Sequence, residues 1–264
     1  MDSTPLYFVH ISDTHIGPRP DYELYGCNPL HRARRMIETI NALPVVPDFV
    51  LHTGDVVSDP DEAAYRLTAE VFTLLRCPVY FVAGNHDAPM MIAKYLKMGS
   101  VSNVHETSLS YTFMVKGVRF IVLDGRGPDE IDPHGLLAEP QFAFLLAALE
   151  RDSAPVAVVV HFPPIPLDSR WLDSEMLLLN GERLHRTLVP IRHRLRGVFF
   201  GHVHRGMTVF RDGILYSSVA STTGQFTAWP TTERVQLDLQ HPACFNFITF
   251  IDDRTIIKEH MVVP

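Results

Sequence analysis

Cysteine is scarce in this sequence of 264 residues, and its three copies form no CxxC pair. Cys27, Cys77 and Cys244 are odd in number and far apart along the chain. This pattern argues against a disulfide framework and against a zinc site built from thiolates. We therefore expect the cysteines to be small hydrophobic residues without a chemical role.

Long apolar runs and an excess of positive charge are also missing. No tract is long or apolar enough to cross a bilayer, and residues 1–5 lack the basic and apolar regions of a signal peptide. We therefore expect a cytoplasmic protein without a membrane partner. The 23 Lys and Arg residues against 30 Asp and Glu give a formal net charge of −7. That balance disfavours a long nucleic acid as partner, because duplex DNA is normally met by a basic face.

The chain has the composition of an ordinary globular protein, with 46% hydrophobic and 20% charged residues. A chain of this length is near the upper limit for one hydrophobic core, and an α/β domain of this size needs no second one. We therefore predict a single domain over residues 1–264.

Apolar periodicity and turn residues predict strands and helices in alternation. Asp59 as a cap, Pro60 and Glu62 predict a helix that begins at Pro60. Its apolar stripe continues through Leu74 and Leu75, and the helix is predicted to stop before Pro78. Further helices are predicted over residues 30–43, 88–98, 140–151 and 181–188. Strands are predicted over residues 8–12, 49–53, 79–83, 111–115, 118–124, 156–160 and 198–200, with late hairpins that turn at 211–213 and 252–253. This order predicts an α/β fold in which sheets are flanked by helices.

Three long stretches without a periodic pattern lie at residues 17–29, 163–180 and 221–242. Unstructured connections of this length are uncommon in a compact domain and are usually functional. We expect these three loops to wall the site.

Five short apolar runs each end, within a residue or two, on a group that can bind a metal. The groups that follow them are Asp13 and His15, Asp55, Asn85 with His86 and Asp87, His161, and His202 with His204. Runs this short and rich in β-branched and aromatic residues are typical of buried strands. Ligand sites of open α/β sheets lie outside the carboxyl ends of their strands, so these side chains are expected to converge.

The converging set has the donors for two metal ions. Asp13, His15, Asp55 and His204 could hold one ion, and Asp55, Asn85, His161 and His202 a second, with the Asp55 carboxylate as the bridge. Mixed oxygen and nitrogen donors suit Mn, Fe, Co or Zn better than Ca or Mg. Two such ions roughly 3.5 to 4 Å apart can share a water, lower its pKa and clamp the oxygens of a phosphoryl group.

His86 is not needed as a ligand in this arrangement. A histidine there could contact a phosphoryl oxygen or protonate the leaving alkoxide. Asp87 could orient the His86 ring or cap the following helix, and the nearby Pro89 favours the cap.

The motifs Asp13-Thr14-His15, Gly54-Asp55, Gly84-Asn85-His86-Asp87, His161 and Gly201-His202-Val203-His204 resemble, in order and spacing, the signature of the calcineurin-like metallophosphoesterases. Within that superfamily the chain looks most similar to bacterial class III cyclic nucleotide phosphodiesterases and glycerophosphodiesterases. The resemblance implies a four-layer αββα sandwich of two mixed sheets, a binuclear centre of Fe, Mn or Zn, and usually a homo-oligomer. Carried over, Asp13, His15, Asp55, Asn85, His161, His202 and His204 are the metal ligands, and His86 is the acid that contacts phosphate.

Two residues and one longer stretch need separate comment, because they differ from the relatives or add a candidate substrate contact. Phe162 stands where many relatives have a second histidine, at a position that is not a ligand. His134, in a loop that is rich in histidine in cyclic nucleotide relatives, is a candidate phosphate contact beside Asn85 and His86. The stretch 222–244 matches poorly, and substrate choice in the relatives depends partly on it.

We predict a metal-dependent phosphodiesterase in which a metal-activated hydroxide attacks a small-molecule diester, such as a cyclic nucleotide like cAMP or a glycerophosphodiester. One alternative is a phosphomonoesterase or protein phosphatase of the same superfamily. Against it, the second motif lacks the Asp-Arg-Gly continuation of Ser/Thr phosphatases. The third motif also ends in Asp87, where a glutamate would be expected in those phosphatases. Another alternative is a non-catalytic scaffold on the same fold, although such proteins typically lose ligands and this chain has all seven.

Overall fold

The computed structural model describes residues 4–238 and 240–262. The first three residues, on which the expectation about a signal peptide partly rests, lie outside this range. None of the helices in the described part of the chain is long and apolar enough to cross a membrane.

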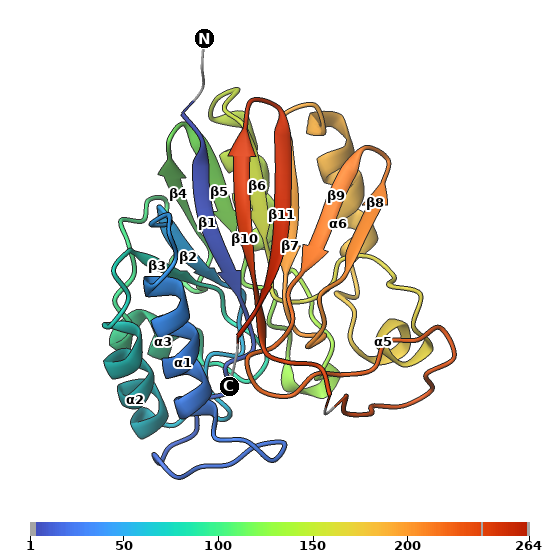
Figure 1. Cartoon of the computed structure of the whole chain (residues 1–264). Coiled ribbons are helices and arrows are strands. Elements are labelled where there is room, and N and C mark those ends of the chain that lie inside the picture. The colour runs from blue at the N-terminus through green and yellow to red at the C-terminus, as the bar shows by residue number, and fades with distance from the viewer. Residues whose placement is uncertain (1–3, 239, 263–264) are drawn as a thin grey trace.

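Two mixed β-sheets form the centre of the fold (Figure 1). The first has five strands in the order β11 (Arg254–Met261), β10 (Cys244–Ile251), β1 (Leu6–Ile11), β2 (Phe49–His52) and β3 (Val79–Phe81). The second has six strands in the order β4 (Tyr111–Val115), β5 (Val118–Val122), β6 (Val156–Val159), β7 (Leu195–Phe200), β9 (Ile214–Ser218) and β8 (Thr208–Arg211). Strands β1, β2 and β3 are parallel to one another, as are β5, β6, β7 and β9.

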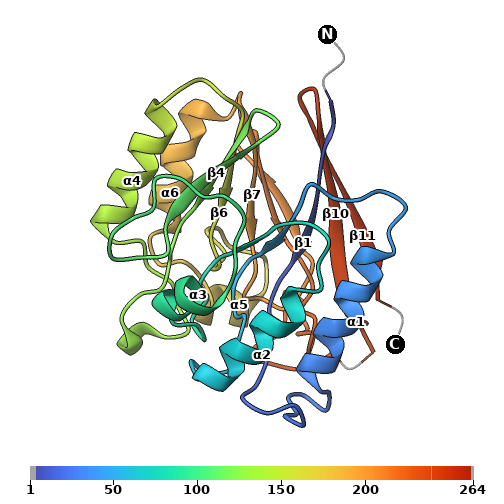
Figure 2. The ribbon, with the colours of Figure 1, turned by 90° about the vertical axis from the view of Figure 1, so that its left-hand side faces the viewer.

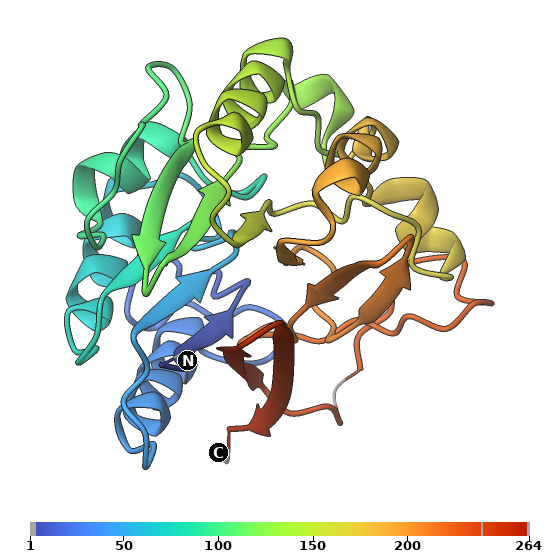
Figure 3. The ribbon, with the colours of Figure 1, turned by 90° about the horizontal axis from the view of Figure 1, so that it is seen from above.

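Helices cover the outer faces of both sheets (Figures 2 and 3). The first sheet is flanked by α1 (Pro29–Asn41), α2 (Glu62–Phe72) and α3 (Pro89–Tyr95). The second is flanked by α4 (Glu139–Glu150) and α6 (Gly181–Leu188), with the short α5 (Arg170–Glu175) near its lower end in Figure 1. Two short 3₁₀ helices complete the described elements, at Asp129–Ile131 and Val189–Ile191. The predicted αββα sandwich is therefore confirmed, and so are both late hairpins.

A cluster of phenylalanines joins the two sheets. The Phe8 ring of β1 stacks on Phe49 of β2 at 5.0 Å and meets the edges of Phe120 and Phe199 from the second sheet, both at 5.6 Å. All four side chains are fully buried. Edge-to-face aromatic pairs add to the free energy gained by burial, so this cluster fixes how the sheets face each other. It thereby places the ends of strands from both sheets at one edge of the sandwich.

The predicted start and end of the second helix were wrong. The helix is capped by Asp61, whose side chain accepts a hydrogen bond from the Ala63 N–H at 2.7 Å, so Pro60 lies outside it. It ends at Phe72, because the Asn41 side chain of α1 bonds the Leu74 carbonyl and the Arg76 N–H and draws this segment out of the helix. Helix α5, inside the predicted loop 163–180, was not predicted.

Candidate metal centre

All seven predicted metal ligands follow strands that end at the same edge of the sandwich. Asp13 and His15 follow β1, Asp55 follows β2 and Asn85 follows β3, all in the first sheet. The second sheet contributes His161 after β6, and His202 and His204 after β7. Parallel strands bring their carboxyl ends together, and here those ends come from two sheets that face each other. The site therefore lies at the junction of the sheets.

Two groups of ligand atoms form there, each with all its atoms within 4.8 Å of one another. The first group comprises Asp13, His15, Asp55 and His204, and the second comprises Asp55, His161 and His202. Asp55 belongs to both, as expected of a bridging carboxylate. Its Oδ2 lies 3.6 Å from His15 Nε2 and 3.4 Å from His161 Nε2.

Asn85 follows Gly84, whose backbone packs against two members of the second group. A side chain on its neighbour Gly84 would place a Cβ 2.2 Å from Asp55 Oδ1 and 2.8 Å from His161 Nε2, so only glycine fits there. The Asn85 Oδ1 is buried and has no hydrogen-bond partner within the described residues. Asp13 Oδ2 is also buried and without a hydrogen-bond partner within the described residues. Buried acceptors are rarely left unpaired, so these atoms fit an oxygen- and nitrogen-liganded cation.

Backbone carbonyls fix the tautomers of two of the histidines. His161 Nδ1 donates to the Thr53 carbonyl at 2.7 Å, and His204 Nδ1 donates to the Gly224 carbonyl at 2.7 Å. In each neutral ring, Nε2 therefore carries the lone pair. His204 Nε2 faces His15 Nε2 across 3.0 Å, and His161 Nε2 faces His202 Nδ1 across 3.0 Å. Lone pairs directed in this way into a shared space suit metal coordination.

Burial and the carboxylates control the charge of the site. Burial lowers the pKa of His15 and of His202 well below the ordinary value, so both are neutral, as ligation requires. Burial alone would also lower the pKa of His161, but the Asp55 carboxylate raises it to about 9. Burial acts against the charged form of Asp55 too, yet His161 and His15 hold the pKa of this carboxyl well below its usual range. A bound cation would therefore take the place of a proton at His161.

Five of the seven predicted ligands have a left-handed backbone conformation. Asp13, His15, Asp55, His202 and His204 have φ values of 56°, 44°, 53°, 71° and 49°. Residues other than glycine rarely adopt such angles, and residues that do cluster at functional sites. The turns after β1, β2 and β7 are thus built to direct side chains into one space at a local energetic cost.

His86 lies next to the first group of ligand atoms. Its Nδ1 donates to the Ser58 carbonyl at 2.7 Å, its backbone N–H donates to Asp55 Oδ1 at 3.0 Å, and its ring meets the edge of His15 at 4.9 Å. Burial lowers the pKa of His86, but the Asp55 carboxylate and the Ser58 carbonyl outweigh this and raise it. The side chain is anchored, partly exposed to solvent and readily protonated.

Asp87 does not cap the following helix, contrary to expectation. The residue before α3 is Ala88, which makes no side-chain capping bond. The buried Asp87 carboxylate instead accepts hydrogen bonds from the Val56, Val57 and Gly84 N–H groups at 2.9–3.2 Å. Burial raises the pKa of Asp87 to about 7. Asp87 thus joins the turn after β2 to the turn after β3.

Two buried histidines behind the site were not predicted to matter. His52 Nε2 bonds the Thr14 hydroxyl at 2.9 Å, and its Nδ1 accepts from the Gly54 N–H at 3.3 Å. His10 Nε2 bonds the Thr53 hydroxyl at 2.9 Å. Burial lowers the pKa of each to about 3, so both are neutral. Their position inside strands, before the ligand motifs, gave no signal of this supporting role.

The three predicted wall loops approach one another beside His204. From 221–242, the Phe226 ring stacks on the His204 ring at 4.3 Å. Tyr25, from 17–29, meets the edges of both rings at 6.0–6.2 Å. Trp171, from 163–180, meets Phe226 at 5.5 Å and donates from Nε1 to the Thr227 carbonyl. Trp229 is 69% exposed.

His134 lies in the loop after β5, and its Nδ1 bonds the Leu177 carbonyl at 3.2 Å. The next residue, Gly135, packs on the ring of Phe162, and that ring lies 4.8 Å from the His202 ring. His134 is thus next to Gly135, which reaches the site through Phe162 and His202. Its role as a phosphate contact stays a prediction.

Comparisons with known proteins agree with this geometry. The family model described as calcineurin-like phosphoesterase matches residues 6–206. A 3′,5′-cyclic adenosine monophosphate phosphodiesterase CpdA from Vibrio vulnificus is 25% identical over 92% of this chain and 85% of its own length. A glycerophosphodiester phosphodiesterase GpdQ from Enterobacter lignolyticus is 28% identical over 90% of this chain and 85% of its own.

Among solved structures, a dimetal phosphatase from Danio rerio superposes with a TM-score of 0.75 at 17% identity. The superposition covers 100% of this chain and 98% of that one. At this identity the likeness supports the fold.

Proposed function

The chain belongs to the calcineurin-like phosphoesterase family, and we propose that it is a binuclear metal-dependent phosphodiesterase that hydrolyses small phosphodiesters. The observation that carries the proposal is the pair of ligand groups that share Asp55. A cyclic nucleotide such as cAMP and a glycerophosphodiester are the proposed substrates, because the relatives CpdA and GpdQ are named for these two kinds of diester.

In this proposal Asp13, His15, Asp55 and His204 would hold one ion, and Asp55, Asn85, His161 and His202 the other. The mixed oxygen and nitrogen donors suit Mn, Fe or Zn. When bound, such a pair of ions supplies a nucleophile from water and neutralises phosphoryl oxygens. Two divalent ions exceed the charge of the two aspartates, so the centre would attract an anionic diester.

His86 is the proposed acid. The hydrogen bond from Nδ1 to the Ser58 carbonyl holds the ring, which leaves Nε2 to deliver a proton to the leaving oxygen. The raised pKa of His86 favours the protonated form of the ring, which this role requires. Asn85 and His134 are the proposed further contacts of the phosphate.

We also propose a cytoplasmic homo-oligomer. The three cysteines are free, which suits a reducing compartment. Large apolar side chains are exposed at Phe210 of the edge strand β8 and at Trp229, and such side chains suit contacts between subunits.

The direct test uses protein reconstituted with Mn²⁺ and compares bis(p-nitrophenyl) phosphate with p-nitrophenyl phosphate. We expect faster turnover of the diester, followed by activity on cAMP or glycerophosphoethanolamine in a substrate panel. Faster turnover of the monoester would favour a phosphomonoesterase. Protein that binds no Mn, Fe or Zn would favour the non-catalytic scaffold.

A further inference from the structure

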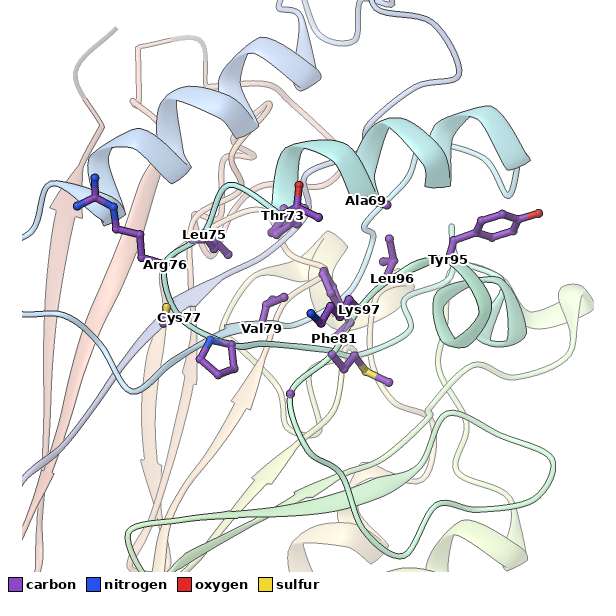
Figure 4. Close-up of a pocket in the computed structure, with 14 residues that line it drawn as sticks. Ala69, Thr73, Leu75, Arg76, Cys77, Val79, Phe81, Tyr95, Leu96 and Lys97 are labelled. Carbon is purple, nitrogen blue, oxygen red and sulfur yellow. The ribbon is translucent and has the colours of Figure 1, made fainter.

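A cavity of about 410 Å³ lies at the free edge of the first sheet (Figure 4), and none of the predicted metal ligands lines it. Strand β3 ends the sheet there, and the cavity lies between the end of α2 and the segment that follows α3. Its apolar walls come from Ala69, Phe72, Leu75, Val79, Phe81, Leu96 and Met98. A cavity of this size and composition is typical of a small-molecule site.

The polar lining of the cavity is basic. Lys97 and Arg76 belong to it, and no aspartate or glutamate does. Figure 4 shows the Lys97 amino group turned toward Val79, whereas the Arg76 guanidinium points away from the other lining side chains. Within the described residues, no ion pair is formed by either cation. Apolar walls with an unpaired ammonium group complement a ligand that has an apolar body and one anionic head.

The floor of the cavity is also the back of the metal centre. Two lining rings, Phe72 and Phe81, each lie 5.7 Å from the ring of His52. His52 in turn bonds the Thr14 hydroxyl, between two predicted ligands, and the Gly54 N–H, which precedes Asp55. A shift of either ring on ligand binding would therefore be passed to the turns that carry the metal ligands.

We propose that this cavity is an effector site for an amphipathic carboxylate of about ten carbons, whose binding changes the affinity of the metal centre. The carboxylate pairs with Lys97 and the alkyl chain lies against Phe72, Leu75 and Met98. Binding of the carboxylate to the cavity does not depend on the proposed phosphodiesterase activity. Its effect on metal affinity rests on one part of the proposed function, namely that the predicted ligands bind metal.

The first experiment is calorimetric titration of metal-free protein with decanoate. We expect saturable binding at one site per chain, and binding of decylamine, which has the same chain but a cationic head, at least about tenfold weaker. Lys97→Met should weaken decanoate binding about threefold, because it removes the charge of an exposed side chain and keeps the apolar length. Lys94→Met is the matched control, since Lys94 is exposed nearby and outside the lining, and it should bind as the wild type does.

A second variant separates loss of the site from loss of the fold. Ala69→Phe adds a ring inside the cavity from α2 and should abolish binding while the melting temperature and Mn content stay near those of the wild type. Absence of decanoate binding to the wild type, or equal binding to wild type, Lys97→Met and Ala69→Phe, would overturn the site.

The second experiment measures the Kd for Mn²⁺ with and without saturating decanoate. We expect a change of about fivefold or more, and the reciprocal change in decanoate affinity when Mn²⁺ is bound. Acetate is the control for direct coordination, because it has the same head group without the chain and should have no effect. An unchanged Mn²⁺ affinity with decanoate bound, or an equal effect of acetate, would overturn the effector role. Neither readout depends on the identity of the substrate.

Discussion

The edge of the sandwich that carries the predicted metal ligands and the aromatic cluster between the sheets are built in opposite ways. At the edge, five predicted ligands have positive φ and several buried polar atoms lack partners within the described residues. Between the sheets, Phe8, Phe49, Phe120 and Phe199 pack without a polar atom in their side chains. Packing in the cluster stabilises the fold, and this free energy offsets the cost of holding strained, desolvated donors at the edge. Substitutions in the two regions should therefore have separable effects.

The largest effect is expected from Asp55→Asn, which removes the shared carboxylate charge. Asn tolerates the left-handed φ of 53° at this position, so the fold should survive. We expect loss of both ions, measured by metal analysis, and a fall in kcat for the diester of at least about 10³-fold. Asp168→Asn is a matched control, because Asp168 has a φ of 57° but is exposed. Near-normal activity of Asp55→Asn would contradict the bridge.

The next effect is expected from His86→Gln. It removes the proposed proton donor and leaves the seven predicted ligands intact. We expect two ions per chain as in the wild type and a fall in kcat of about 10² to 10⁴-fold. A substrate with a better leaving group should lose less, because it needs less protonation. Loss of metal from this variant would show instead that His86 is a ligand.

The core should show the reverse behaviour. Phe120→Ala removes a fully buried ring of the aromatic cluster and should lower the free energy of unfolding by about 3–5 kcal/mol. Denaturant melts measure the loss, and at low temperature the folded fraction should bind Mn²⁺ like the wild type. Met90→Ala, at a residue that is 66% exposed, should change the unfolding free energy by less than about 0.5 kcal/mol. A Phe120→Ala protein that is stable yet metal-free would break the comparison.

The last prediction concerns the pH dependence of stability that His10 and His52 produce; both lie in strands behind the predicted ligands. Both have a pKa near 3 when folded, and 6.5 is the ordinary value when unfolded. Below pH 6.5 the unfolded chain binds protons that the folded chain excludes, so stability falls from there toward pH 3. The slope should reach about 1.4 kcal/mol per pH unit for each histidine. His10→Gln should reduce the slope by about one proton, and an unchanged slope would show that His10 is not held neutral.

The sequence was sufficient to predict that the candidate ligands share one edge of the sandwich, because each follows an apolar run whose strand character is clear. It could not locate the start of α2, because Asp59 and Asp61 are both suitable caps and a tertiary contact of Asn41 decides the far end. The role of Asp87 was equally hidden, since two of its partners are backbone N–H groups about 30 residues away. The effect of burial on His10 and His52 depends on the packed fold.

The central claim is that seven side chains from two sheets hold two ions through one shared carboxylate. The most direct measurement is the Mn²⁺ content of dialysed protein, together with its electron paramagnetic resonance spectrum. Our account predicts two ions per chain with the spectrum of a coupled pair, and one ion without coupling in Asn85→Ala. A single uncoupled ion in the wild type, or no change in Asn85→Ala, would contradict it.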